Sequence, residues 1–203
     1  LTCARACNVF SKNGDSFGIH LASNDSYMHV ENCDTKNISA AGDNTHSVVN
    51  PPSVAYGFIV EGDSDHIKFK KCDACRIKAP RFAIGFAAED SEHVAMEYCR
   101  VAKVKATSSH DLSSPKEAFD FEVEGSKHTF LGHPCVQDVS INNEEHAKHS
   151  ASVVAGIAVD KESAFTDIHC PKISDIYGGA GKAFDILDEG FRTKVRCAIE
   201  CSC

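Results

Sequence analysis

Short runs in which apolar residues alternate with other residues recur along the chain. In the clearest copy, Phe58 and Val60 lie on one side of a first run, and Ile67 and Phe69 lie on one side of a second. A period of two residues is typical of a β-strand with one buried face, and the Gly-, Asp- and Ser-rich stretch between the runs is typical of a turn. The pattern predicts two short strands joined by a turn, and a third short strand around Ile77.

The same pattern occurs six times. Each copy opens with a Gly or Asp between two apolar residues and reaches a cysteine 12 to 15 residues later. Copies begin 28 to 39 residues apart, which is typical of solenoids, whose units bury their apolar faces against their neighbours. We therefore expect an all-β fold, a right-handed parallel β-helix of about six coils. The opening residues are Gly18, Gly57, Gly85, Asp120, Gly156 and Asp185, and the cysteines are Cys33, Cys72, Cys99, Cys135, Cys170 and Cys197.

The repeat covers residues 1–203, so we expect a single domain. Leu1 and Cys203 both fall inside the pattern, which favours an excerpt of a longer chain. With 21 basic and 29 acidic residues the net charge is −8, which argues against nucleic acid and against an anionic membrane surface as partners. No stretch approaches the roughly 20 apolar residues of a membrane span, so no membrane insertion is expected.

Two copies resemble the sequence repeat of a known superfold. Residues 64–72 and 91–99 are similar to the pattern Ser-x-Asn-apolar-x-apolar-x-Asn-Cys of right-handed β-helix proteins, with His66 and His93 where the first Asn is usual. This is the pectin-lyase-like superfold of pectate lyases, polygalacturonases and many phage tailspikes. The resemblance implies the fold but little about function, because the superfold hosts enzymes, adhesins and structural stems alike.

Two motifs look like parts of a polygalacturonase but lie at the wrong positions. Residues 15–21 resemble a first-strand motif of that family, yet the next coil reads Ala-Tyr-Gly-Phe at residues 55–58 where the paired aspartates belong. Arg76 begins an Arg-Ile-Lys signature, but it follows Cys72 instead of lying on the first strand. No arginine of the pectate-lyase kind projects from a first strand. Neither activity is implied, no catalytic residue is assigned, and the sequence leans away from an enzyme.

Insertions account for the differences in repeat length. They follow the third strand of a copy, at residues 39–55, 105–118 and 142–154, and contain Gly, Asn, Ser and Pro, so we expect three loops. All three should project from one edge of the solenoid. Loops on a rigid scaffold often form binding sites, but these could also merely cover the edge.

One outward column of the first strands is acidic. Four of its members directly follow an inward apolar residue, and Glu189 lies near the same site in the last copy. Equivalent residues in neighbouring coils lie about 5 Å apart. Three interpretations stay open: a solvated turn, a ladder of oxygen ligands suited to Ca²⁺, or an acid/base pair of a glycosidase. No other cofactor and no confident metal site is predicted. The candidate residues, for a cation or a glycan, are Glu61, Glu89, Glu124, Asp160 and Glu189.

The neighbouring outward column is mostly apolar. It holds Ile59, Ala87, Ala158 and Leu187, together with His20 and Glu122. An apolar face on a surface strand is normally covered, either by loops or by another subunit. We therefore expect a packing face there, with self-association or a partner subunit. The adjoining column of opening glycines is also expected to face outward and to admit a close backbone.

Two further columns carry reactive side chains. His66, His93 and His128 align in successive copies, as a metal-binding or pH-responsive ladder or as a hydrogen-bonded corner stack. Six of the eleven cysteines share one position, which predicts an interior column of free thiols and folding in a reducing compartment, with later display on a virion or cell surface left open. The motifs Cys72-x-x-Cys75 and Cys201-x-Cys203 are weak zinc signals.

Taken together, these features favour a β-helix segment of a larger surface or virion protein, such as a spike, fibre or adhesin. It would bind glycans or pack in an assembly. The first alternative is a polysaccharide-active lyase, hydrolase or epimerase that uses the acidic column. The second is a purely structural component, with the apolar column as its subunit contact.

Overall fold

The computed structural model describes residues 1–11, 14–22, 24–41, 53–107, 116–142, 152–179 and 181–196. The regular structure in these ranges consists of β-strands. In this part of the chain no helix is long and apolar enough to cross a membrane.

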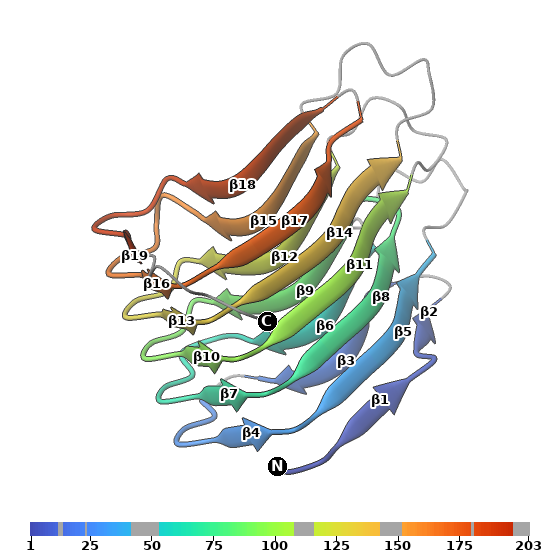
Figure 1. Cartoon of the computed structure of the whole chain (residues 1–203). Helices are drawn as coiled ribbons and strands as arrows, with labels where there is room; N and C mark the ends of the chain where they lie inside the picture. Colours follow the sequence, from blue (N-terminus) through green and yellow to red (C-terminus); the bar gives the residue numbers. More distant parts are fainter. Residues whose placement is uncertain are drawn as a thin grey trace.

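The strands form three parallel sheets, and each coil contributes one strand to each sheet (Figure 1). Sheet I contains β3 (Ser16–Leu21), β6 (Val54–Val60), β9 (Phe82–Glu89), β12 (Glu117–Glu124), β15 (Val153–Val159) and β18 (Lys182–Asp188). Sheet II contains β4 (His29–Glu31), β7 (Lys68–Lys70), β10 (Ala95–Glu97), β13 (Phe130–Gly132), β16 (Asp167–His169) and β19 (Lys194–Arg196). Sheet III contains β1 (Arg5–Cys7), β5 (Asp34–Ala40), β8 (Asp73–Ala79), β11 (Arg100–Thr107), β14 (Cys135–Asn142) and β17 (Lys172–Tyr177), and the short β2 (Phe10–Ser11) also pairs with β5.

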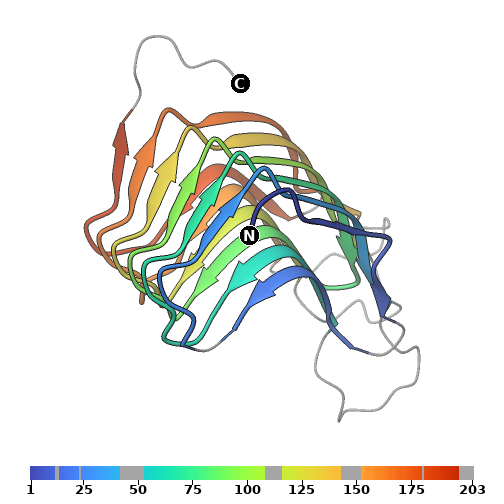
Figure 2. The same cartoon turned by 90° about the horizontal axis from the view of Figure 1, so that it is seen from below.

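This arrangement is an all-β parallel β-helix of about six coils, which confirms the predicted fold class. Viewed along its axis, the coils lie one behind another around a common interior (Figure 2). The predicted alignment of the first strands is also confirmed, since Ile19, Phe58, Phe86, Phe121 and Ile157 pair in register from coil to coil.

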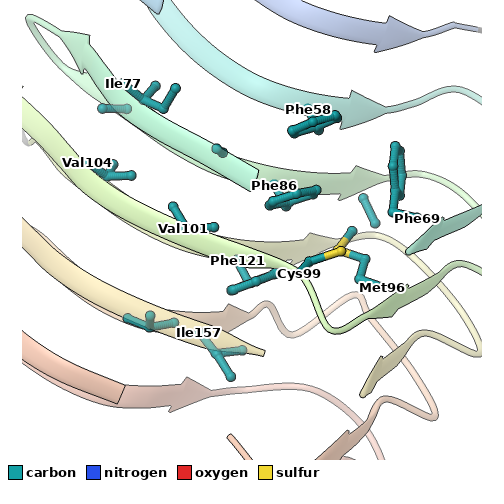
Figure 3. Packing of buried hydrophobic residues seen from close by; sticks show 14 of the residues in the cluster. Phe58, Phe69, Ile77, Phe86, Met96, Cys99, Val101, Val104, Phe121 and Ile157 are labelled. Carbon is teal, nitrogen blue, oxygen red and sulfur yellow. The ribbon is translucent and has the colours of Figure 1, made fainter. Parts of the chain in front are cut away.

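A column of stacked aromatic rings fills the interior (Figure 3). The Phe86 ring stacks on Phe58 at 4.5 Å and on Phe121 at 5.3 Å between ring centroids, and Phe69 from sheet II packs edge-on against Phe58 at 5.8 Å. All four side chains are fully buried. Because Phe86 stacks on rings from the coils before and after it, burial of this column joins these coils to one another.

The opening glycines face the interior, which corrects the expected outward column. A Cβ atom at Gly57 would lie 2.6 Å from the carbonyl oxygen of Gly85 and 2.8 Å from the Cβ of Ala74 in sheet III. Asp120 takes this position in the fourth coil, and its side chain is fully buried. Burial raises the pKa of its carboxyl well above the usual range, and the backbone N–H of Gln137 is the group that opposes this shift.

The interior cysteine column is shorter than predicted. Cys33, Cys72 and Cys99 are buried free thiols at one position of three successive coils. In the next coil Cys135 lies one residue further along, because it pairs with Arg100, and it is disulfide-bonded. Cys170 lies one residue earlier, on a left-handed turn position. The last cysteine of the predicted column, Cys197, lies outside the described residues.

Most of the three predicted loops also lies outside the described residues. The residues that flank them belong to strands of sheet III before each loop and of sheet I after it. All three insertions are therefore attached at the same edge of the solenoid, between sheets III and I.

Candidate functional site

Sheet I places the predicted acidic column at the ends of its strands, where the chain turns toward sheet II. Glu89 pairs directly with Glu124 in the next coil. The side chain of Glu61 contacts His20, with 2.9 Å between Oε1 and Nε2. Asp160 turns back into its own turn, where Oδ1 accepts hydrogen bonds from the backbone N–H groups of Ser163 and Gly125. Glu189 is exposed in the last coil.

Two of the five predicted acids are brought together, and Glu122 from the neighbouring column joins them. We call Glu89, Glu122 and Glu124 the carboxyl cluster. One oxygen of each lies within 4.8 Å of an oxygen of the other two. Glu89 and Glu122 are half-buried, and Glu124 is exposed.

Loss of water and mutual repulsion disfavour the charged forms of these three groups. Burial raises the pKa of Glu89 to about 7, and repulsion from the neighbouring Glu124 contributes to this rise. The hydroxyl of Tyr56 donates a hydrogen bond to Glu89, which opposes the rise. Burial also raises the pKa of Glu122 well above its usual range, with Glu89 and Glu124 contributing repulsion. Burial also raises the pKa of Glu124, and repulsion from Asp160, Asp90 and Glu162 adds to that shift. Near neutral pH the cluster therefore shares protons that isolated carboxyls would release.

Within the described residues, one oxygen of this cluster has no partner. Oε1 of Glu89 is buried and makes no hydrogen bond there. Buried polar atoms are nearly always hydrogen-bonded, and exceptions mark sites where a proton, a water molecule or a ligand completes the structure. This oxygen is the strongest local sign that the cluster binds something.

Aromatic side chains adjoin the cluster on the same face. The Phe17 ring stacks on Tyr56, with centroids 5.5 Å apart and planes 3° from parallel, and also on the His20 ring at 4.7 Å. Phe17 and Tyr56 are half-buried and His20 is exposed. The outer face of sheet I thus presents carboxyls beside partly exposed aromatic rings.

The predicted packing face is largely buried within the chain itself. Ile59 and Ala87 are 1% exposed and Ala158 is 7% exposed, while Leu187 is partly buried. They belong to a second hydrophobic cluster, on the outer side of sheet I, whose other members include Ile84 and residues of the adjoining columns. Three of the four residues are therefore not available as a contact surface for another subunit.

The turn between sheets I and II carries the predicted histidine column. His66, His93 and His128 stack with centroids 4.6 and 5.0 Å apart, and Tyr27 and Phe165 extend the column by one ring at each end. We call this column the imidazole ladder. Each of the five residues has a positive φ angle, so one left-handed turn is repeated in five coils.

A groove of about 340 Å³ lies on the outer side of sheet III, away from the carboxyl cluster. Three of its charged side chains are already paired, since Arg100 contacts Asp73 at 2.7 Å and Asp34 contacts Arg5 at 3.2 Å. Cys75 also lines it, whereas Cys72 of the same CxxC motif is buried in the interior. The two thiols face opposite sides of the strand and do not form a metal site, and Cys201-x-Cys203 lies outside the described residues.

Sequence reasoning overlooked three residues of these sites. Glu122 was assigned to the apolar column. It pairs with Ala87 in one neighbouring coil and with Ala158 in the other, and a charged residue between two alanines could have been recognised as an exception to the apolar pattern. Tyr56 reaches the cluster from the start of its strand, and no spacing rule predicts that reach. Asp65, which contacts two histidines of the ladder, was read only as a turn residue.

The geometry therefore defines two candidate sites, the carboxyl cluster on sheet I and the imidazole ladder at the adjacent turn. A scan of protein-family models and a search of curated proteins gave no match to this chain, so its own residues must carry the functional argument.

Proposed function

We propose that this β-helix binds a neutral polysaccharide on the outer face of sheet I, with the carboxyl cluster as the centre of the site. The observation that carries the proposal is the buried, unpartnered Oε1 of Glu89 inside a group of carboxyls that retain protons near neutral pH. A protonated carboxyl both donates and accepts hydrogen bonds, as sugar hydroxyls do. The partly exposed rings of Phe17 and Tyr56 add the apolar surface on which a sugar ring can pack.

Electrostatics indicate the class of glycan. Every charged group that shifts the pKa of the three cluster carboxyls is itself an acid. The chain as a whole carries a net charge of −8. An anionic polysaccharide would meet repulsion at this face, whereas a neutral one would not. Placement in a spike, fibre or adhesin, and assembly with other subunits, stay predictions.

Affinity gel electrophoresis tests this proposal. The protein would be run through gels containing dextran, laminarin or galactomannan as neutral probes, and polygalacturonate or alginate as acidic ones. We expect retardation by at least one neutral probe and by neither acidic probe. Glu122→Leu and Glu89→Leu should weaken the retardation at least about tenfold, because each replaces a hydrogen-bonding carboxyl that lies partly out of water by an apolar side chain.

A matched control is Glu31→Leu, which removes a carboxylate from β4 in sheet II. Its nearest cation is Lys70 at 3.6 Å, a surface pair whose loss should have little effect. The proposal fails if no neutral probe retards the protein, or if all three variants are retarded like the wild type.

Hydrolysis is a second candidate, favoured by one specific observation. The cluster oxygens lie within 4.8 Å of one another, close to the roughly 5 Å between the two carboxyls of a retaining glycosidase. A pKa of about 7 for Glu89 suits a general acid. Release of reducing ends from the bound probe, lost in Glu89→Gln, would support it. Retardation without release of reducing ends would show that the protein binds the polysaccharide but does not hydrolyse it.

A further inference from the structure

Two histidines of the imidazole ladder and the adjacent Asp65 form a group of three potential metal ligands, which lies outside the proposed glycan site. Asp65 and His66 lie in the turn between β6 and β7, and His93 lies in the equivalent turn between β9 and β10 (Figure 1). The two turns are in register, since Asp65 forms a parallel bridge with Glu92. The fold thus holds one carboxylate and two imidazoles together from neighbouring coils.

The carboxylate lies between the two imidazoles. Asp65 Oδ2 is 2.8 Å from Nδ1 of His66, and Oδ1 is 2.9 Å from Nδ1 of His93. All three ligand atoms lie within 4.8 Å of one another. The side chains of His66, His93 and Asp65 are 47%, 45% and 38% exposed, so an ion can reach them from solvent.

The backbone holds the group in place before any ion binds. His66 and His93 have φ angles of 56° and 53°, in the left-handed region, and their N–H groups bond to carbonyl oxygens of the following coil. Their rings are stacked between Tyr27 and His128. Ligands that are already positioned lose less conformational freedom when they bind an ion.

We propose that Asp65, His66 and His93 bind a divalent transition-metal ion of the Zn²⁺ class, through one carboxylate oxygen and both Nδ1 atoms. Two imidazoles and one carboxylate are a common protein ligand set for Zn²⁺, and they leave a fourth position open to water. Ligand atoms around a tetrahedral Zn²⁺ are about 3.4 Å apart, given metal–ligand distances of about 2.1 Å. To reach that spacing, the distance from each Nδ1 to its carboxylate oxygen, 2.8 and 2.9 Å, has to lengthen by about half an ångström. The two Nδ1 atoms, which lie within 4.8 Å of one another, have to come to the same spacing.

The proton balance is simple. In the metal-free protein each Nδ1–H donates to the carboxylate, and the ion replaces these contacts by accepting a lone pair from each Nδ1. The ring protons move to the Nε2 atoms, so neutral imidazoles need not release a proton. Protons compete with the ion for the same nitrogen atoms, so binding weakens as pH falls.

Calorimetric titration with Zn²⁺ tests the site in the whole chain, with Asp65→Asn and His93→Ala as variants. Each should weaken one class of Zn²⁺ site at least about tenfold. His133→Ala is the matched control: His133 also lies at a left-handed turn and stacks on an aromatic ring, that of Tyr98 at 4.7 Å, but it has no carboxylate between two imidazoles. The far-ultraviolet circular dichroism of all variants should match the wild type.

Co²⁺ provides a second readout, because its visible spectrum distinguishes nitrogen and oxygen ligands from thiolates. We expect a wild-type spectrum without thiolate charge transfer, reduced in both site variants and retained in His133→Ala. The proposal is overturned if Asp65→Asn and His93→Ala bind Zn²⁺ as the wild type does. It is equally overturned if His133→Ala loses the same affinity, or if the Co²⁺ spectrum shows thiolate ligation at the affected site.

Discussion

The carboxyl cluster and the imidazole ladder are built in the same way but differ in their exposure to water. Each repeats one kind of side chain in successive coils, at the spacing that parallel strands impose. In the cluster, like charges gather on a half-buried face, and burial raises the pKa of Glu89. In the ladder, the partly exposed Asp65 lies between two exposed imidazoles, and their hydrogen bonds lower the pKa of its carboxyl. Column position alone thus does not decide chemistry; burial and the identity of the neighbours do.

The largest expected effect concerns the core that holds both regions in place. Phe86→Ala should lower the free energy of unfolding by about 3–5 kcal/mol, because it removes a fully buried ring that stacks on two others. Tyr98→Ala is the control, since Tyr98 also stacks on a neighbouring ring but is 55% exposed, and it should cost less than about 1 kcal/mol. Urea unfolding measures both. Equal losses would show that position in the stack matters more than burial.

Glu89→Gln tests the cluster through the pH dependence of stability. The wild-type carboxyl has a pKa of about 7 in the folded protein and of 4.5 in the unfolded chain, so the folded state binds the proton more tightly. Its contribution to stability is complete below pH 4.5 and is lost as pH rises to about 7. That loss is at most about 3 kcal/mol, reduced by solvent screening.

The Gln variant lacks this titration, so its stability curve should be flatter between pH 4.5 and about 7. Urea midpoints across this range provide the measurement, with Glu31→Gln as the reference for loss of a carboxylate elsewhere. Parallel curves for the wild type and Glu89→Gln would contradict the account of the cluster.

The smallest effect is expected in the ladder. Asp65→Asn should shift the urea midpoint less than Glu89→Gln does, because the carboxylate is exposed to water. The pKa of Asp65 is lowered in the folded protein, so its contribution is present at neutral pH and is lost as pH falls through that lowered pKa. The difference between wild type and variant should therefore shrink in acid. A difference that grew in acid would rule out the hydrogen bonds from His66 and His93 as the cause.

Much of the fold could be predicted from the sequence, because period-two alternation and regular Gly or Asp positions determine the register of sheet I. The cysteine column was misaligned because the turn between sheets I and II varies by one residue between coils. Counting from the buried serine of that turn gives the true register: Ser64 and Ser91 are each eight residues before a column cysteine, whereas Ser126 is eight residues before Pro134. A marker inside the turn thus predicts the following strand better than one before it.

The candidate site was less predictable for two physical reasons. Register placed Glu89 beside Glu124, but Glu122 and Tyr56 join them through side-chain reach and burial, which a column pattern does not encode. The apolar column around Ile59 was expected to be covered by loops or by another subunit; Ile59, Ala87 and Ala158 are buried within the chain itself, in one cluster with residues of the adjoining columns.

A carbon-13 NMR titration of the Glu89 side-chain carboxyl tests the central claim, that the outer face of sheet I holds a desolvated, proton-sharing carboxyl cluster. The account predicts a midpoint of about 7 in the wild type, and a lower midpoint in Glu124→Gln, where one source of repulsion is removed. A midpoint near 4.5 in both proteins would contradict it, because Glu89 would then be an ordinary, solvated carboxylate.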